Sequence, residues 1–176
     1  MRPHSTLACS IACAMLLLAA PSPAQDGYTR IRALDHESTK LIEEARAGSP
    51  TVQRLLDRLE GSDLITYIKV GYRPEKPRAT TAIISAVPDV RYVLIVIGSF
   101  TSATERHLLL GHELQHAVEL ADNPEVRDER GMERLYKRIG WREDHRTYET
   151  AAAQAMGRQV QVELRAARVP VVAAAR

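Results

Sequence analysis

Three residues in one five-residue segment could bind a metal ion and move a proton. His112 and His116 are four residues apart, and on an α-helix such residues lie on one face, about 6 Å apart along the axis. Two imidazoles so placed can bind one Zn²⁺ ion, because zinc–nitrogen bonds are about 2.0–2.1 Å long. Glu113 follows the first histidine, where its carboxylate could accept a proton from a zinc-activated water. The segment therefore predicts a hydrolytic zinc centre.

The residues on either side predict that this segment is helical. The apolar run Val90–Phe100 is typical of a strand, and Ser102 with Glu105 three residues later is typical of a capping box that begins a helix. Helical spacing continues over Arg106–Leu120, and Asp122–Pro124 ends it. The segment then matches the HExxH arrangement of zinc metallopeptidases. The alternative is two ordinary histidines on a half-buried helix.

A catalytic zinc ion usually has a third protein ligand, and the sequence narrows the choice. The metzincin pattern needs a glycine three residues after the second histidine and a third histidine six residues after it. Glu119 and Asp122 occupy those positions, so this pattern is excluded. Glu119 shares the face of His112 but lies almost one turn beyond His116. Glu119 is a candidate third ligand, but its place on the helix favours contact with a metal-binding histidine or a position in the wall of the cleft.

Glu149 is the preferred third ligand. We expect it early in a last helix, where Ala152, Ala153 and Met156 share its side. Small residues there would let this helix pack closely against the histidine helix. The remaining alternatives are Glu125, Glu129, Glu143 and His145. An ordinary solvated carboxylate near a helix start is the non-functional interpretation of Glu149.

With Glu149 included, the chain resembles the gluzincins, in which HExxH is completed by a glutamate on a downstream helix. Its shortness makes it most similar to the minimal members, the minigluzincins. That resemblance covers roughly residues 90–165, and it implies an N-terminal helix, a small sheet, the metal helix and a glutamate helix. The family often has an aspartate four residues after the glutamate, but Ala153 stands there. The orientation of His112 is therefore left open.

The resemblance implies a hydrolase, a zinc-dependent metallopeptidase that acts on peptide or protein substrates. Zn²⁺ would be bound by His112, His116 and Glu149, with Glu113 as the general base. The candidate donors to the developing oxyanion are Tyr148, Tyr136 and His145. The edge of the strand Val90–Phe100 could pair with an extended substrate. The alternatives are a non-catalytic domain stabilised by zinc and an interaction domain with a vestigial site.

The rest of the sequence predicts an α+β fold in which helices precede and follow a small sheet. Short connections predict that this sheet is a three-stranded antiparallel meander. The expected strands are Asp63–Tyr72, Ala79–Val87 and Val90–Phe100. The expected helices outside the histidine segment are Tyr28–Ala47, Pro50–Leu59, Met132–Ile139 and His145–Ala167, the last capped by Asp144.

The start of the chain is typical of a signal peptide over residues 1–24. Arg2 precedes the apolar stretch Thr6–Ala20, and Ser22–Ala24 matches a small-x-small cleavage site. We expect a secreted or periplasmic protein with one zinc-metallopeptidase-like domain over residues 25–168 and a flexible tail over 169–176. A lipoprotein signal is the alternative. Both cysteines, Cys9 and Cys13, lie in the leader, which excludes disulfides and cysteine ligands from the mature chain.

Charge and composition argue against two classes of partner. The formal net charge is +2, no basic block occurs, and aromatic residues make up 5% of the chain, so we expect no nucleic-acid binding. After the leader, no segment predicts a membrane span. Two further histidines are interpreted as surface groups, since His36 has no partner histidine four residues on and His107 lies about 140° from His112 around the helix.

Overall fold

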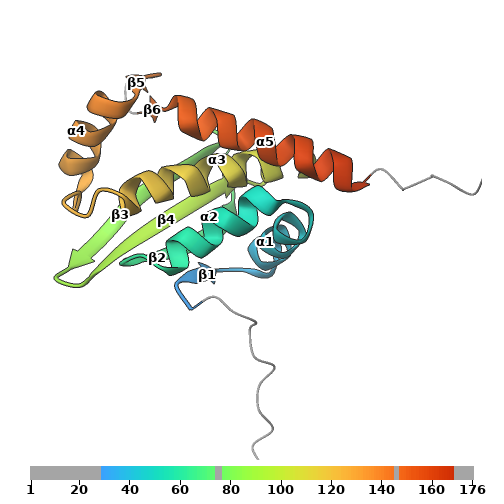
Figure 1. The fold of residues 1–176 in the computed structure, drawn as a ribbon, viewed down its shortest axis with the longest axis horizontal. Coiled ribbons are helices and arrows are strands. Elements are labelled where there is room, and N and C mark those ends of the chain that lie inside the picture. Colours follow the sequence, from blue (N-terminus) through green and yellow to red (C-terminus); the bar gives the residue numbers. More distant parts are fainter. Residues whose placement is uncertain (1–28, 74–76, 145–146, 169–176) are drawn as a thin grey trace, which may run out of the picture.

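The structure is a computed structural model that describes residues 29–73, 77–144 and 147–168. The predicted signal peptide (1–24), the predicted tail (169–176) and His145 lie outside these residues. Helices and two small sheets make up the described chain, which confirms the α+β class (Figure 1). Within this part of the chain, no helix is both long and apolar enough to cross a membrane.

The elements follow one another in a mixed order of strands and helices. The strands are β1 (Ile31–Ala33), β2 (Leu64–Gly71), β3 (Ala79–Val87), β4 (Val90–Gly98), β5 (Trp141–Arg142) and β6 (Tyr148–Glu149). The helices are α1 (His36–Gly48), α2 (Pro50–Glu60), α3 (Ala103–Ala121), α4 (Glu129–Ile139) and α5 (Ala151–Arg168).

The larger sheet has the order β1-β2-β4-β3, so the predicted meander is wrong, although its antiparallel pairing of β3 with β4 is confirmed. β4 lies between β2 and β3, parallel to β2 and antiparallel to β3. β4 is an inner strand, and its helix-facing side chains are all 0% exposed, the apolar Val93, Ile95 and Ile97 as well as Arg91. β3 carries more polar side chains and lies at an edge. The prediction that β4 offers a free edge to a substrate is therefore also wrong, because both of its edges are paired.

The N-terminal helix begins later than predicted. Residues 31–33 form β1, parallel to β2, instead of the first turns of a helix over Tyr28–Ala47. Asp35 begins α1, because its Oδ1 accepts a hydrogen bond from the backbone N–H of Ser38 at 2.7 Å. The second helix was predicted closely, since Ser49 caps α2 and Gly61 ends it.

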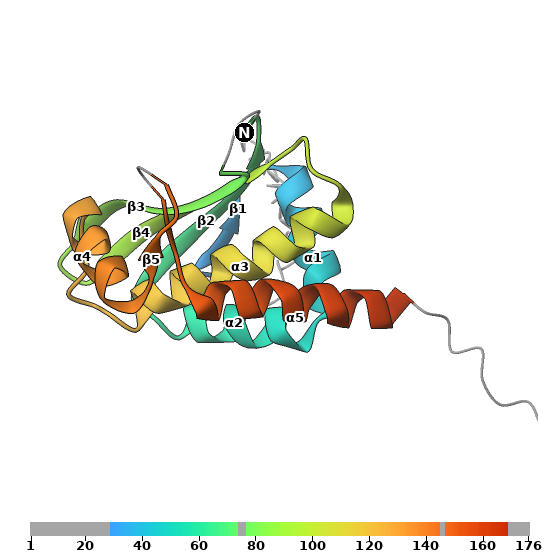
Figure 2. The same ribbon diagram turned by 90° about the horizontal axis from the view of Figure 1, so that it is seen from above.

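The helices α1, α2, α3 and α5 lie on one face of the larger sheet, and α5 runs along α3 (Figure 2). The core forms where α2 and α3 meet the inward side chains of β2 and β4. Leu110, Leu114 and Leu120 of α3 are each 0% exposed, and burying such a side chain stabilises the fold by about 1.5–3 kcal/mol. The histidine helix is thus held by its opposite, apolar side.

A buried arginine fixes the C-terminal end of α3 to the sheet. Arg91 of β4 donates from Nη2 and Nε to both carboxylate oxygens of Asp63, at 2.6 and 2.7 Å. Its Nη1 donates to three backbone carbonyls at and after the helix end, those of Leu120, Asn123 and Val126. The carbonyls of Leu120 and Asn123 also accept backbone N–H groups, so the guanidinium adds further hydrogen bonds that hold this end of α3 to the sheet.

The last helix also begins later than predicted. The expected helix over His145–Ala167 starts at Ala151 instead, because residues 148–149 pair with residues 141–142 as β6 and β5. Thr150 caps it in place of Asp144: its Oγ1 accepts from the N–H of Ala153 at 3.0 Å. The third predicted helix, Met132–Ile139, lies within α4, which begins three residues earlier behind its cap Asp128.

Candidate metal centre

The predicted helix over Arg106–Leu120 is confirmed as the middle of α3. It begins at its cap Ser102, whose side chain accepts from the N–H of Glu105 at 3.2 Å. The rings of His112 and His116 lie on one face, with centroids 4.8 Å apart and planes at 80°. That face is turned away from the buried leucines of α3. The helix therefore presents both imidazoles side by side, as the spacing predicts.

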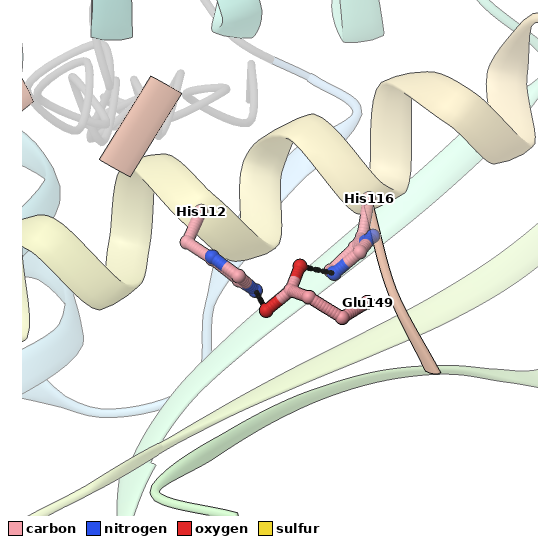
Figure 3. Close-up of side chains that lie close together, drawn as sticks. All are labelled: His112, His116 and Glu149. Carbon is pink, nitrogen blue, oxygen red and sulfur yellow. Dashed lines mark ion pairs between the residues drawn. The ribbon is translucent and has the colours of Figure 1, made fainter. Parts of the chain in front are cut away.

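The carboxylate of Glu149 lies between the two imidazoles (Figure 3). Its Oε2 is 3.5 Å from Nε2 of His112, and its Oε1 is 3.7 Å from Nε2 of His116. Glu149 is 6% exposed, so it is a carboxylate withdrawn from water and aimed at two ring nitrogens. It ends β6 and does not lie in the last helix, where it was predicted.

The geometry of these three side chains is compatible with a metal ion. One potential ligand atom from each residue lies within 4.8 Å of the other two. Ligand atoms bound to one Zn²⁺ at about 2.0–2.1 Å are about 3.3 Å apart. The two nitrogen–carboxylate distances, 3.5 and 3.7 Å, are close to that value but end on different oxygens of Glu149, so the group, which spans up to 4.8 Å, would contract around an ion. Two imidazoles and one carboxylate are also a donor set that zinc accepts.

The close approach of α5 to α3 is made possible by two glycines. A Cβ on Gly111 would come within 2.6 Å of a methyl group of Val160, and one on Gly157 would come within 3.1 Å of the carbonyl of Leu108 and 3.3 Å of the Cβ of His112. The sequence predicted this close approach from Ala152, Ala153 and Met156 instead. Of these, Ala153 is fully buried whereas Ala152 is exposed.

Glu119 contacts the second histidine from the far side of its ring. Its Oε2 is 2.8 Å from Nδ1 of His116, while Glu149 faces the Nε2 of the same ring. A proton on Nδ1 that is donated to Glu119 leaves the Nε2 lone pair free for a metal. The structure thus places Glu119 behind the histidine, one turn beyond it on α3.

Burial and nearby carboxylates affect the two histidines in opposite directions. Burial, and then the nearby charge of His116, lower the pKa of His112 to about 4, so its ring is neutral. Burial also opposes a charge on His116, but the hydrogen bond to Glu119 and the charges of Glu113, Glu119 and Glu149 raise the pKa of His116 above its ordinary value. Of the two rings, His116 is therefore the one whose protonated form is stabilised by its surroundings.

Glu113 faces the same site and contacts the edge strand. It is 4% exposed, and burial raises the pKa of its carboxyl group. Its Oε2 accepts a hydrogen bond at 2.7 Å from Oγ1 of Thr81 in β3, and its backbone carbonyl lies 3.1 Å from the same hydroxyl. The carboxylate is thus held between α3 and β3.

A cleft of about 880 Å³ opens in front of these residues. It is bounded by β3, α3, α4 and the β5–β6 hairpin. The lining includes Thr81 and Ile83 of β3, Met132 and Tyr136 of α4, and Arg142 and Tyr148 of the hairpin. Ligand-binding clefts are typically about 300–1,000 Å³, so this cleft has the size of a binding site.

The other predicted site residues lie outside the group of His112, His116 and Glu149. Tyr136 is 5% exposed, and its hydroxyl donates to the backbone carbonyl of His116 at 3.2 Å. The hydroxyl of Tyr148 lies 3.3 Å from a carboxylate oxygen of Glu133 and 3.0 Å from Nη2 of Arg142. Glu129 and Glu143 line the cleft without joining the histidine group, and Glu125 is exposed. The last oxyanion candidate, His145, is outside the described residues.

One histidine was assigned wrongly from the sequence. His107 was predicted at the surface but is 2% exposed, because α1 packs over that side of α3 and brings Glu44 to 3.4 Å from its Nε2. His36 is exposed, as predicted.

Two site residues, Thr81 and Thr150, were not singled out from the sequence. A threonine just before an alanine-rich helix is a capping signal that could have revealed Thr150. Thr81 lies in a strand with several hydroxyl residues, and no local signal distinguishes it.

No protein-family model, no curated protein and no solved structure matches the chain.

Proposed function

We propose that the chain is a secreted or periplasmic zinc-dependent metallopeptidase, similar in its site to the gluzincins. The observation that carries this proposal is the buried Glu149 carboxylate between the two HExxH imidazoles, with Glu113 in the same cleft. Zinc would be held by His112, His116 and Glu149. A bound Zn²⁺ supplies Lewis acidity, which lowers the pKa of a water molecule and polarises a carbonyl group.

The residues of the chain then divide the remaining work. Glu113 takes the proton from the attacking water and passes it to the leaving amine. Its burial favours this role, because a raised carboxyl pKa makes it a stronger base. The hydroxyl of Thr81 holds one carboxylate oxygen and leaves the other for the water. Glu119 keeps the His116 ring in a fixed orientation.

The substrate would bind in an extended form along β3. This strand is an edge of the sheet, and residues 79–83 of it line the cleft. An edge strand offers backbone donors and acceptors to an added strand, which would bring the scissile carbonyl in front of the histidines. The edge that could pair with substrate is thus β3, in place of the predicted edge of β4.

Glu113 distinguishes this proposal from a domain in which zinc is only structural. A structural site is closed by four ligands and has no use for a buried carboxylate beside an open cleft. The test is hydrolysis of a broad fluorogenic peptide library by the mature chain loaded with zinc. Glu113→Gln should keep the metal and lose nearly all of the activity. Wild type treated with a chelator should lose both the metal and the activity. A Glu113→Gln variant as active as wild type would refute the assigned base, and a zinc-bound wild type that cleaves no peptide would favour the structural alternative.

A further inference from the structure

Thr150 hydrogen-bonds to two carboxylates of the proposed zinc site, those of Glu149 and Glu119. It follows Glu149 directly and is 2% exposed. Its backbone N–H donates to Oε1 of Glu149 at 2.7 Å, and its hydroxyl donates to Oε1 of Glu119 at 2.6 Å. One residue thus contacts both the carboxylate that would bind zinc and the carboxylate that orients His116.

The hydrogen bonds around Thr150 leave its hydroxyl one direction in which to donate. Its Oγ1 already accepts from the N–H of Ala153 at 3.0 Å, so the proton is directed to Glu119. Threonine is branched at Cβ and has few side-chain rotamers, which keeps this arrangement. A hydroxyl that donates to a carboxylate makes a short, strong hydrogen bond, and the distance of 2.6 Å is in that range.

Glu119, which lies on α3, links Thr150 to His116 by hydrogen bonds. One of its oxygens accepts from Thr150 and the other lies 2.8 Å from Nδ1 of His116, and Glu119 itself is 8% exposed. Glu149 and His116 come from different elements, β6 and α3. The path from Thr150 through Glu119 to His116 is therefore a polar connection between these elements behind the site.

We propose that Thr150 is a positioning residue of the zinc site. Its hydroxyl bond to Glu119 fixes the position of the Glu149 carboxylate relative to the His116 ring. This inference rests on the proposed zinc site. If Thr150 only capped α5, its loss would lower the stability of the metal-free chain and leave zinc affinity unchanged. If it acts through Glu119, the loss of its hydroxyl weakens zinc binding itself.

The test compares zinc affinity in matched variants, measured by competition with a chromophoric chelator, and the thermal unfolding of the metal-free forms. Thr150→Val keeps the shape and removes the hydroxyl, and Thr150→Ser keeps the hydroxyl. We expect Thr150→Val to weaken zinc binding about 10–100-fold, the usual effect of losing a group that orients a ligand, and Thr150→Ser to retain most of the affinity. Ser102→Ala is the control, since it removes a helix cap of α3 away from the site and should lower stability alone.

A double variant tests the route of the effect. In a chain that already carries Glu119→Ala, Thr150→Val should weaken zinc binding little further, because the partner of the hydroxyl is gone. If the losses of zinc affinity from Glu119→Ala and Thr150→Val multiply in the double variant, Thr150 does not act through Glu119.

The possible failures are distinguishable. Thr150→Val with unchanged zinc affinity overturns this inference alone, whereas a wild-type chain that binds no zinc overturns the proposed function with it. Should Thr150→Val not fold, the zinc-loaded crystal structure of wild type decides: the Thr150 hydroxyl should remain on Glu119, and a hydroxyl turned elsewhere contradicts the proposal.

Discussion

Gly140 is the position where one methyl group should disturb the proposed zinc site most directly. Gly140 ends α4 and faces β6, and a Cβ built there would lie 2.1 Å from the backbone carbonyl oxygen of Glu149. Its backbone is extended (φ −143°, ψ −155°), which any residue can adopt. The requirement for glycine here is therefore one of space alone.

The size of the disturbance follows from that contact. Ordinary van der Waals contact begins at 3.4 Å, so the atoms must separate by about 1.3 Å (3.4 − 2.1) before alanine fits. The contacted atom is backbone, so relief has to move β6, and Glu149 moves with it. Zinc–ligand distances tolerate about ±0.2 Å. Gly140→Ala should consequently weaken zinc binding more than about 100-fold, beyond the usual cost of losing an orienting group.

The assay is zinc competition on folded protein, with Gly61→Ala as the matched control. Gly61 ends α2, and a Cβ there meets nothing closer than 3.7 Å at a φ of −83°, so this variant should bind zinc as wild type does. Gly140→Ala should also lower stability by about 1–3 kcal/mol, as overpacking usually does. A Gly140→Ala chain with wild-type affinity and stability would refute the described contact between α4 and β6.

Three further predictions concern residues that hold the fold or the base. Burial alone would raise the pKa of Glu163 on α5, but hydrogen bonds, among them those from Thr51 at the start of α2, outweigh burial and lower this pKa to about 2. The ionised carboxylate therefore stabilises the fold fully above about pH 4.5, and this stabilisation is lost as the pH falls toward 2. Glu163→Gln should therefore cost about 1–2 kcal/mol at pH 7 and almost nothing at pH 2, in urea titrations at both pH values; an equal cost at both would contradict the assignment. Arg91→Met should destabilise by about 3–5 kcal/mol, because it leaves the partly buried Asp63 carboxylate without its guanidinium partner and removes one donor from each of three carbonyls. Chemical denaturation showing a loss below about 1 kcal/mol would refute this. Thr81→Val should lower kcat about 10-fold with zinc affinity unchanged, since it removes the donor to Glu113; unchanged kcat in a zinc-bound variant would count against that role.

Local signals were sufficient for the helices whose ends are set by neighbouring residues. Ser102 with Glu105 begins α3, and Ser49 and Gly61 bound α2, because these caps act within one turn of chain. The placement of His112 and His116 on one face follows from the same helical spacing. Those parts could be predicted because each depends on contacts within a few residues.

The sheet order and the last helix depend on contacts between distant residues. Short connections suggested a meander. In the structure β4 lies between β2 and β3, where its side chains are buried against the helices. The start of α5 was decided by the pairing of Glu149 with Trp141 and by the space at Gly140. The sequence predicted Asp144 as the cap, and Thr150 was not considered. Glu149 could be proposed as a ligand, but its position in a strand could not.

Native mass spectrometry of the mature chain, purified without chelators and supplied with zinc, tests the central claim most directly. Wild type should carry one zinc ion per chain. Glu149→Ala should carry none after dialysis, whereas Glu119→Ala should keep zinc, because Glu119 contacts only the far nitrogen of His116. A metal-free wild type would contradict the whole account. Zinc retained by Glu149→Ala and lost by Glu119→Ala would contradict the ligand assignment and the resemblance to gluzincins.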